Sequence, residues 1–209
     1  MKLTKYEHAC FTIEKDGKVL VVDPGSYTTD FVAPENVVAI VLTHIHSDHF
    51  DKDIVASIID KNPDAVIIAP KQVTDVIEVF ETRSVDGGDS VTIEPFNLEF
   101  FGSQHATIYG EAGGSDQNVG VLINELVYYP GDSFTLPNKP IDTLALPVAA
   151  PWSKFSETID FLKAVKPRFA FPTHDAILSA TGKGLPDTMT SRFVPDVSYQ
   201  RIDGQTIDV

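Results

Sequence analysis

Hydrophobic and polar residues alternate along the first part of the chain, as they do in β-strands with one buried face. Strand-like runs cover residues 9–14 and 18–23, and Lys15-Asp16-Gly17 between them predicts a hairpin turn. A run of six apolar residues, 37–42, follows. Its continuous hydrophobicity predicts a buried strand.

The period of the pattern then changes to that of amphipathic helices. Asp51 or Asp53 caps the first predicted helix, in which apolar residues recur on one face up to residue 59. The second helix begins at Pro70 and keeps the helical spacing of apolar residues up to Phe80. The third spans roughly residues 156–165, and a proline stops it.

Further strands are predicted at 65–69, within 84–105, and at 119–123, 126–129, 143–147 and 168–171. A glycine-rich polar loop, 106–117, separates two of them. Strands followed by helices occur twice along the chain, and each half contains an apolar strand that ends in Thr-His. We therefore predict an α/β fold made of two halves of one sandwich, with a single domain over residues 1–209.

The composition limits the functions that fit this fold. The chain has 209 residues, a formal net charge of −14 and one cysteine, Cys10. The charge disfavours long nucleic acid and anionic membranes as partners. A single cysteine excludes an intramolecular disulfide and an iron–sulfur cluster. Because we find no signal-peptide or membrane-spanning pattern, we expect a cytoplasmic protein, and association into homo-oligomers stays open.

Residues 44–49, His-Ile-His-Ser-Asp-His, hold half of the six histidines of the chain. Such a cluster becomes favourable when a divalent metal ion lies among the side chains. His44 and His46 are two residues apart on extended chain and point the same way. Asp48 and His49 follow as the chain turns, so they face a different position. The four donors therefore suit two metal ions, and the alternative is a polar loop that caps the next helix.

Three later residues lie where a predicted strand meets a loop, which is where α/β sheets place their sites. They are His105, Asp132 and His174. Each one alone is compatible with an ordinary loop residue. Together they supply the ligands that a dinuclear site still needs.

With these motifs in this order, the chain resembles hydrolases of the metallo-β-lactamase superfamily over nearly its whole length. The matching residues are His44, His46, Asp48, His49, His105, Asp132, His174 and the early Val21-Val22-Asp23-Pro24. Two softer motifs are similar to the small bacterial hydrolases related to the ascorbate-6-phosphate lactonase. These motifs are Tyr6-Glu7-His8-Ala9-Cys10-Phe11 and Leu146-Pro147-Val148.

The resemblance implies a four-layer αββα sandwich with the site at one edge of the paired sheets. It implies a first metal ion on His44, His46 and His105, and a second on Asp48, His49 and His174, with Asp132 bridging both. It also implies that Asp23 orients a ligand imidazole. From the sequence alone, Asp23 is equally well explained as a turn residue at the end of a strand. Zinc is the first metal expected for these ligands, with manganese, iron and nickel as alternatives.

Differences between this sequence and other branches of the superfamily reduce the number of activities that fit it. True β-lactamases have Cys where Asp132 stands, and the diiron flavoproteins have Glu where His46 stands, so lactam cleavage and redox chemistry are disfavoured. No long insertion follows His105, which disfavours a nuclease. Phe50 stands directly after the histidine motif, where glyoxalase II and the tRNA-processing enzymes commonly have a small residue. The substrates of those enzymes are therefore disfavoured.

The expected function is therefore hydrolysis of a small ester-like, lactone or phosphodiester substrate, with a metal-bridging hydroxide as the nucleophile and Asp132 at the reaction centre. An anionic or strongly polarised small molecule fits such a centre. One alternative is a cyclic-nucleotide or other phosphodiesterase. An alternative of another class is a non-catalytic metal-binding or sensing protein.

Three further features have two readings each. His8 contacts substrate or moves a proton, or it is a hydrogen-bonded structural histidine. Trp152 lines the pocket, or it is a core aromatic anchored near the surface. The loop 106–117 closes over the substrate, or it is a mobile hairpin.

Overall fold

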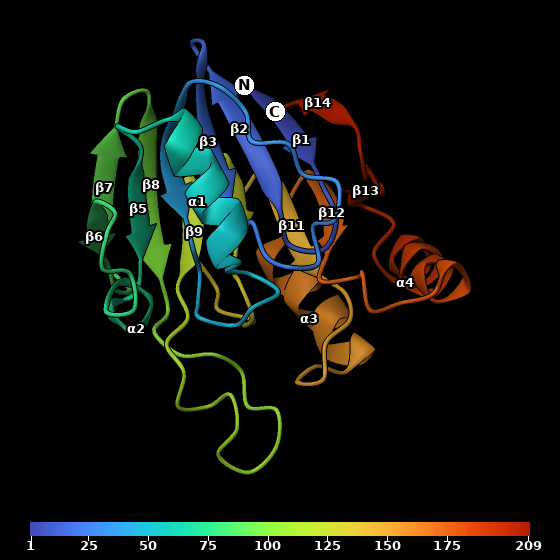
Figure 1. The fold of residues 1–209 in the computed structure, drawn as a ribbon. Helices are drawn as coiled ribbons and strands as arrows, with labels where there is room; N and C mark the ends of the chain where they lie inside the picture. The colour runs from blue at the N-terminus through green and yellow to red at the C-terminus, as the bar shows by residue number, and fades with distance from the viewer.

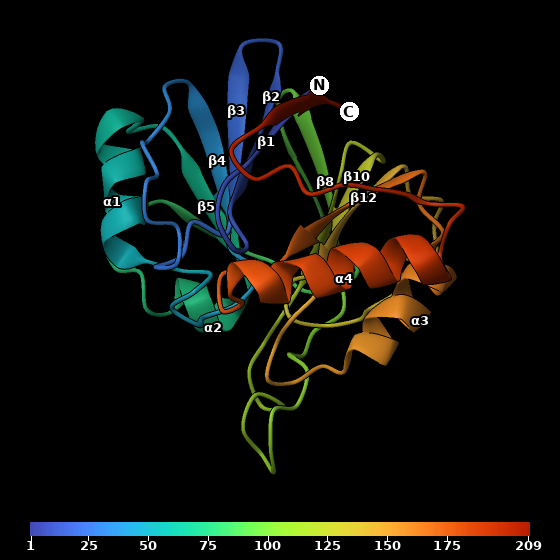
Figure 2. The same cartoon turned by 90° about the vertical axis from the view of Figure 1, so that its right-hand side faces the viewer.

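Two seven-stranded sheets pack face to face in the computed structural model, which describes residues 1–209. Helices cover the outer face of each sheet, with α1 and α2 on one side and α3 and α4 on the other (Figure 1, Figure 2). The predicted four-layer αββα sandwich is confirmed. No helix of the chain combines the length and the hydrophobicity needed to cross a membrane.

The first sheet has the strand order β14-β1-β2-β3-β4-β5-β6. Its strands are β1 (Lys2–Lys5), β2 (Phe11–Lys15), β3 (Lys18–Val22), β4 (Val37–Val41), β5 (Val66–Ala69), β6 (Thr82–Ser84) and β14 (Thr206–Asp208). The pairs from β14 to β3 are antiparallel, and the pairs from β3 to β6 are parallel. The predicted hairpin between β2 and β3 is confirmed.

The second sheet has the strand order β13-β12-β11-β10-β9-β8-β7. Its strands are β7 (Ser90–Ile93), β8 (Phe96–Phe101), β9 (Gly120–Ile123), β10 (Val127–Tyr129), β11 (Thr143–Pro147), β12 (Phe169–Thr173) and β13 (Ser198–Tyr199). The pairs from β7 to β10 are antiparallel, and the pairs from β10 to β13 are parallel. Each sheet thus has an antiparallel and a parallel part.

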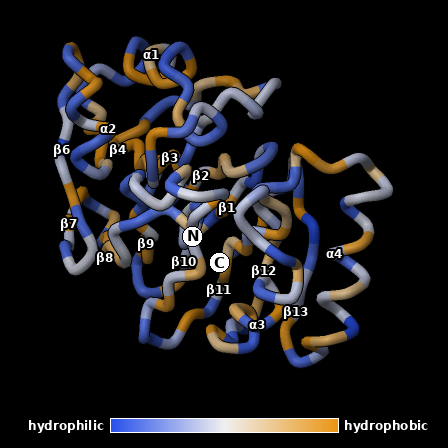
Figure 3. The backbone as a smooth tube through the Cα atoms, turned by 90° about the horizontal axis from the view of Figure 1, so that it is seen from below, coloured by the Kyte–Doolittle hydropathy of each residue, from blue (hydrophilic) through white to orange (hydrophobic).

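The main core lies between the two sheets and contains 23 buried residues. Phe11 of the first sheet packs edge-to-face on Tyr129 and Phe171 of the second, with ring centroids 5.6 Å and 6.0 Å apart. Segments of hydrophobic residues, coloured orange, run through the middle of the molecule when it is viewed from below (Figure 3). Aromatic pairs of this kind stabilise the packing of one sheet on the other. The histidines come from both sheets, so their arrangement at the sheet edge depends on that packing.

Helix α1 (Lys52–Lys61) buries Val55, Ile58 and Ile59 on the first sheet. Its N-cap is Asp51, whose side chain accepts hydrogen bonds from the backbone N–H groups of Asp53 and Ile54. This settles the choice between the two predicted caps in favour of Asp51. Helix α3 (Phe155–Val165) begins within one residue of its predicted start.

Helix α2 (Lys71–Thr74) is much shorter than the predicted helix to Phe80, so that prediction was wrong beyond residue 74. The parallel strands β5 and β6 are joined by only 12 residues, 70–81. A helix of three turns would leave no residues to bring the chain back to the sheet. Val76 and Val79 are consequently exposed on an irregular segment, although their spacing is helical.

The C-terminal part contains helix α4 (Ala180–Phe193) and strands β13 and β14, none of which the pattern predicted. Gly182, Gly184 and Pro186 lie inside α4 and lower its intrinsic helix propensity. Strand β14 pairs with β1, another strand that the pattern did not reveal, and the two termini lie side by side (Figure 1). The N-terminal ammonium donates a hydrogen bond to Val209 O.

Candidate metal centre

All six histidines of the chain lie at one edge of the sandwich, where strands of both sheets end. His44 follows β4, and His174 follows β12, its counterpart in the other sheet. His105 lies in the segment after β8, and Asp132 follows β10. The structure therefore brings together all seven residues that the sequence indicated as ligands, from four separate parts of the chain.

Close packing is required where these segments meet. A Cβ atom on Gly25 would lie 1.9 Å from Asp48 O, so no larger residue fits beside the Asp48-His49 backbone. Gly131 has a φ of +63°, and a Cβ there would lie 2.3 Å from Asn118 Oδ1. That oxygen accepts a hydrogen bond from the backbone N–H of Asp132 at 2.9 Å. Asn118, which the sequence did not indicate, thus fixes the turn that presents Asp132.

The first predicted ligand set consists of His44, His46 and His105. One nitrogen from each ring lies within 4.8 Å of the others. The three ring centroids are 4.6 to 4.9 Å apart, and the rings meet nearly edge to face. This arrangement converges on one point, as three ligands of a metal ion do.

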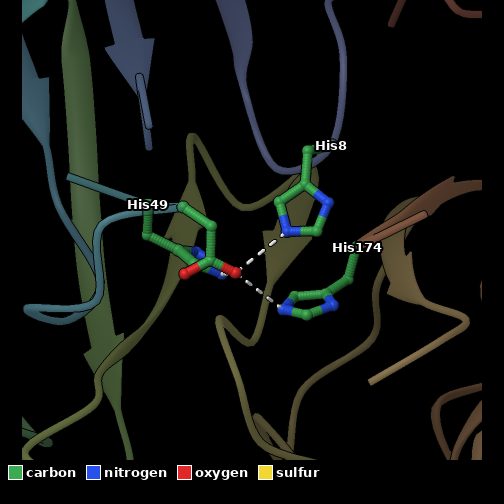
Figure 4. A group of neighbouring side chains, drawn as sticks. His8, His49 and His174 are labelled. Atoms are coloured by element: carbon green, nitrogen blue, oxygen red, sulfur yellow. Dashed lines mark hydrogen bonds and ion pairs between the residues drawn. The ribbon is translucent and has the colours of Figure 1, made fainter. Parts of the chain in front are cut away.

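The second set consists of Asp48, His49 and His174, and His8 joins it. The Nε2 atoms of His8, His174 and His49 lie 3.1 Å, 3.4 Å and 3.7 Å from Asp48 Oδ2. The rings of His8, His49 and His174 approach from different elements (Figure 4). His8 therefore belongs to the second set of side chains. Its contact with Asp48 could not be predicted from the sequence.

Asp132 lies between the two sets and touches both. Its Oδ1 is 3.2 Å from His49 Nε2, and its Oδ2 is 3.3 Å from His105 Nε2 and 3.0 Å from His174 Nε2. The carboxylate is almost fully buried. A carboxylate in this position is suited to a role shared by two metal ions, which stays a prediction.

Hydrogen bonds on the outward nitrogen hold the rings in place. His49 Nδ1 donates to Asp23 Oδ2 at 2.7 Å, and Asp23 also accepts from Thr43 N and Thr43 Oγ1. His44 Nδ1 lies 3.0 Å from Thr43 Oγ1. The Nδ1 atoms of His105 and His174 donate to the carbonyls of Ala106 and Ala149 at 2.5 Å and 2.6 Å. In all four rings Nε2 is then the nitrogen that faces the centre of the site and is left to bind a metal ion.

His46 has the opposite orientation. Its Nε2 lies 3.2 Å from Asp116 Oδ2, which leaves Nδ1 for the site. Asp116 is held by Gln72, whose Nε2 donates to Asp116 Oδ1 at 2.8 Å. No pattern in the sequence indicated this contact, because Asp116 lies in a polar loop without a motif and Gln72 comes from α2.

Five buried polar atoms at the centre of the site have no hydrogen-bond partner in the protein. They are the Nε2 atoms of His44, His49, His105 and His174, and Oδ1 of Asp132. Leaving one buried polar group unpaired costs about 1–3 kcal/mol, and buried polar groups are almost always satisfied in folded proteins. Four imidazole nitrogens and one carboxylate oxygen that converge without partners fit divalent metal ions.

The electrostatics of the site reflect the same arrangement. Burial opposes protonation of His174, but the carboxylates of Asp132 and Asp48 outweigh it and raise the pKa of His174 to about 9. The pKa of His49 is also raised, despite burial, by Asp132 and Asp23. Burial and the neighbouring cation of His49 hold the pKa of His44 well below its ordinary value. The protein's carboxylates thus favour positive charge at the second set of ligands.

His8 is fully buried and has a φ of +55°, which a residue other than glycine rarely adopts. Its Nδ1 accepts a hydrogen bond from Ala176 N at 3.3 Å, so its Nε2 carries the proton and donates to Asp48 Oδ2. Burial lowers the pKa of His8 to about 4, which keeps the ring neutral at pH 7. These contacts favour a residue that orients Asp48, and the role of His8 in proton transfer stays a prediction.

The loop 106–117 leaves the site and returns to it. It extends well beyond the sheets (Figure 2), with Tyr109 87% exposed near its tip. Its base is tied to the site because His105 N donates to Asp116 O and Ala106 N donates to Asp132 O, both at 2.9 Å. Closure of this loop over a substrate stays a prediction.

Trp152, the one tryptophan of the chain, donates a hydrogen bond from Nε1 to Asp132 Oδ2 at 2.7 Å. Its ring lies 6.2 Å and 6.3 Å from the rings of His105 and His174. Trp152 thus contacts the predicted ligand Asp132, and its place in the wall of a substrate pocket stays a prediction. Trp152 also gives the protein a built-in reporter of that site.

We expect zinc titration of the metal-free protein to change the fluorescence of Trp152, because the acceptor of its indole N–H is a predicted metal ligand. The change should saturate at the number of ions bound per chain, as measured by calorimetry on the same sample. Trp152→Phe is the control and should bind zinc without a signal. Unchanged emission during calorimetrically measured binding would contradict a metal ion at Asp132.

Several known proteins are similar to this chain in sequence. Residues 2–174 match the family model of the β-lactamase superfamily domain. Protein Rv0786c of Mycobacterium tuberculosis is 32% identical over 191 residues, which cover 88% of this chain and 89% of that protein. The UPF0173 metal-dependent hydrolase Ta0764 of Thermoplasma acidophilum is 27% identical over 192 residues, 83% of each protein.

Solved structures share the fold. Igni18, described as a novel metallo hydrolase from the hyperthermophilic archaeon Ignicoccus hospitalis, has a TM-score of 0.78 at 17% sequence identity. The similarity covers 100% of this chain and 98% of that one. At this level of identity it supports the arrangement of sheets and helices described above.

Proposed function

The chain belongs to the metallo-β-lactamase superfamily, and we propose that it is a dinuclear metal-dependent hydrolase of small ester, thioester or lactone substrates. One observation carries the proposal. Five buried donor atoms without hydrogen-bond partners converge from both ligand sets, and Asp132 touches both sets. Relatives such as Ta0764 are named metal-dependent hydrolases, which supports the same class of activity.

The proposed ligands divide as the sequence indicated. His44, His46 and His105 would hold one ion, Asp48, His49 and His174 the other, and Asp132 would serve both. Zinc suits imidazole and carboxylate ligands, with manganese, iron or nickel as alternatives. When bound, the ions would lower the pKa of water and polarise the scissile carbonyl group.

The chain's own side chains shape the remainder of the reaction. Hydrolysis breaks the acyl carbon–oxygen bond of the ester, forms a new bond from that carbon to the oxygen of water, and transfers a proton from water to the departing alcohol. Asp23, Thr43 and Asp116 hold ligand imidazoles in one orientation through their outward nitrogens. Such contacts typically change metal affinity or activity by 10- to 100-fold when they are removed.

A cysteine nucleophile does not fit the structure. Cys10 is fully buried, and burial raises the pKa of its thiol to about 12. A reactive cysteine needs an accessible thiolate, which these surroundings prevent. The buried state of Cys10 supports water as the attacking group.

The site is also accessible to a substrate. A hollow of about 610 Å³ opens beside Asp48 and His174, which lies within the size range of small-molecule pockets. Side chains that filled this space would have supported a metal-binding protein without catalysis. The hollow favours the enzyme over the non-catalytic alternative.

The experiment is a screen of lactones, esters, thioesters and phosphodiesters with the zinc-loaded protein, with metal content measured on the same preparation. We expect two ions per chain and hydrolysis of at least one acyl substrate. A chelator should reduce the rate to that of the substrate alone, and added zinc should restore it. Activity that survives complete metal removal would contradict the proposal, as would activity confined to phosphodiesters.

A further inference from the structure

The hollow beside the metal centre is mostly apolar. Seven of its eleven lining residues are hydrophobic. The apolar walls include Val148, Pro151, Phe155, Ile177 and Leu178, and two residues of the metal centre, Asp48 and His174, also line the hollow. A substrate whose reacting group lies at the metal centre could therefore extend an apolar arm along these walls.

No lysine or arginine lines this hollow. Two cations of the neighbouring C-terminal segment are already neutralised. Arg201 pairs with Asp175 and Asp187, and Lys183 lies 3.6 Å from Asp175 Oδ2. A phosphate or a second carboxylate on the arm of a substrate would lose its water without gaining a positive partner, which is costly.

Part of the wall is provided by the segment beyond the family match. That match ends at residue 174, and Ile177 and Leu178 follow it directly. Ile177 is 51% exposed, so its side chain does not serve the core of the protein. The buried ion pair between Asp175 and Arg201 fixes the start of this segment relative to His174. Part of the lining thus comes from residues that follow the matched region of the chain.

We propose that this hollow binds the apolar arm of an acyl group, so that the preferred substrates are esters, thioesters or lactones with an uncharged alkyl or aryl chain. The proposal rests on the hydrolase function and names its substrate class. The carboxylate that the reaction releases remains at the metal centre, and its chain occupies the hollow. Substrates with a phosphate or carboxylate on that chain are disfavoured, because no cation lines the hollow.

The test uses binding of reaction products, which does not require turnover. Acetate, butyrate, hexanoate and octanoate are titrated into the zinc-loaded protein by calorimetry. Each buried methylene should strengthen binding by about threefold to fourfold until the hollow is filled. Adipate, which has the length of hexanoate and a second charge at its end, should bind at least about tenfold more weakly than hexanoate. Affinity that does not depend on chain length would overturn the proposal.

A variant tests the position of the arm. Ile177→Lys places a cation at the wall and should reduce the preference for hexanoate over adipate by about tenfold or more. Val79→Lys is the matched control, because Val79 is an exposed apolar residue outside the hollow, and it should keep the native preference. An unchanged preference in Ile177→Lys would also overturn the proposal.

The two hypotheses fail in different ways. Chelator-sensitive hydrolysis of esters with no dependence on chain length would contradict the apolar arm and support the hydrolase. Chain-length-dependent binding without hydrolysis of any acyl substrate would contradict the hydrolase and support the binding of an apolar chain in the hollow.

Discussion

Replacing Asp132 with asparagine is expected to lower metal-dependent hydrolysis by at least about a thousandfold, equivalent to about 4 kcal/mol of transition-state stabilisation. Asparagine keeps the size of the side chain and removes its negative charge. The carboxylate lies within 3.3 Å of the Nε2 atoms of His49, His105 and His174. Burial opposes its ionisation, but His49 and His174 outweigh burial and hold its pKa well below the ordinary value. The charge is therefore fixed where both ligand sets meet.

The measurement is hydrolysis together with metal content per chain. We expect Asp132→Asn to lose at least one of the two ions during dialysis against buffer. Asp142→Asn is a suitable control, because it removes a carboxylate that pairs with Arg168 at the surface, and it should change the rate by less than about twofold. Two retained ions and a native rate in Asp132→Asn would contradict the shared role of this residue.

Most strands in the middle of the chain and the ligand motifs could be predicted because they depend on local information. The apolar run 37–42 is long enough to indicate a buried strand by itself, and the strand β4 (Val37–Val41) delivers His44 and His46 as expected. His105, Asp132 and His174 could be indicated because strand ends converge in this class of fold. The approach of Asp132 to three imidazoles could not be read from spacing, since it depends on the turn at Gly131 and Asn118.

The elements that the sequence did not reveal depend on long-range contacts. Strand β14 is short and gains its pairing from β1 at the opposite end of the chain, whereas β1 also pairs with its neighbour β2. Helix α4 forms despite Gly182, Gly184 and Pro186, so tertiary contacts override its weak propensity. Its connection to Asp175 through Arg201 places it beside the site.

The residues that orient the ligands could not be predicted from the sequence either. Asp116 reaches His46 from the base of a polar loop, and Gln72 supports it from α2. Neither residue belongs to a motif, and no sequence spacing links them to residue 46. Asp23 is the exception, because it lies in the early Val-Val-Asp-Pro motif, and the structure shows it bound to His49 and Thr43.

The affinity for zinc is expected to rise steeply with pH between 6.5 and 9. In the metal-free protein the pKa of His174 is about 9, and that of His49 is also raised. Both rings therefore carry a proton at pH 7 that a metal ion must displace. One displaced proton makes affinity rise about tenfold per pH unit, and two make it rise about a hundredfold. Competition with a chelator of known affinity at pH 6.5, 7.5 and 8.5 measures this slope.

The stability of the metal-free protein should follow the opposite trend. The pKa of His174 is raised from 6.5 in the unfolded chain to about 9 in the folded protein. Protonation therefore stabilises the fold fully below pH 6.5, and this contribution of about 3 kcal/mol is lost as pH rises through 9. Thermal unfolding of the metal-free protein should accordingly occur at lower temperature at pH 9 than at pH 6.5, whereas excess zinc should reverse the order.

His174→Gln separates this effect from other titrations in the protein. Glutamine retains a donor and an acceptor and carries no titrating proton, so the variant should lose the part of the pH dependence of metal-free stability between 6.5 and 9 that His174 contributes, while His49 keeps its own part. It should also release about one proton fewer when zinc binds, which calorimetry in two buffers of different ionisation enthalpy can count. A native slope in His174→Gln would show that the carboxylates Asp48 and Asp132 do not hold a proton on this ring, and the proposed competition between protons and metal ions would then be wrong.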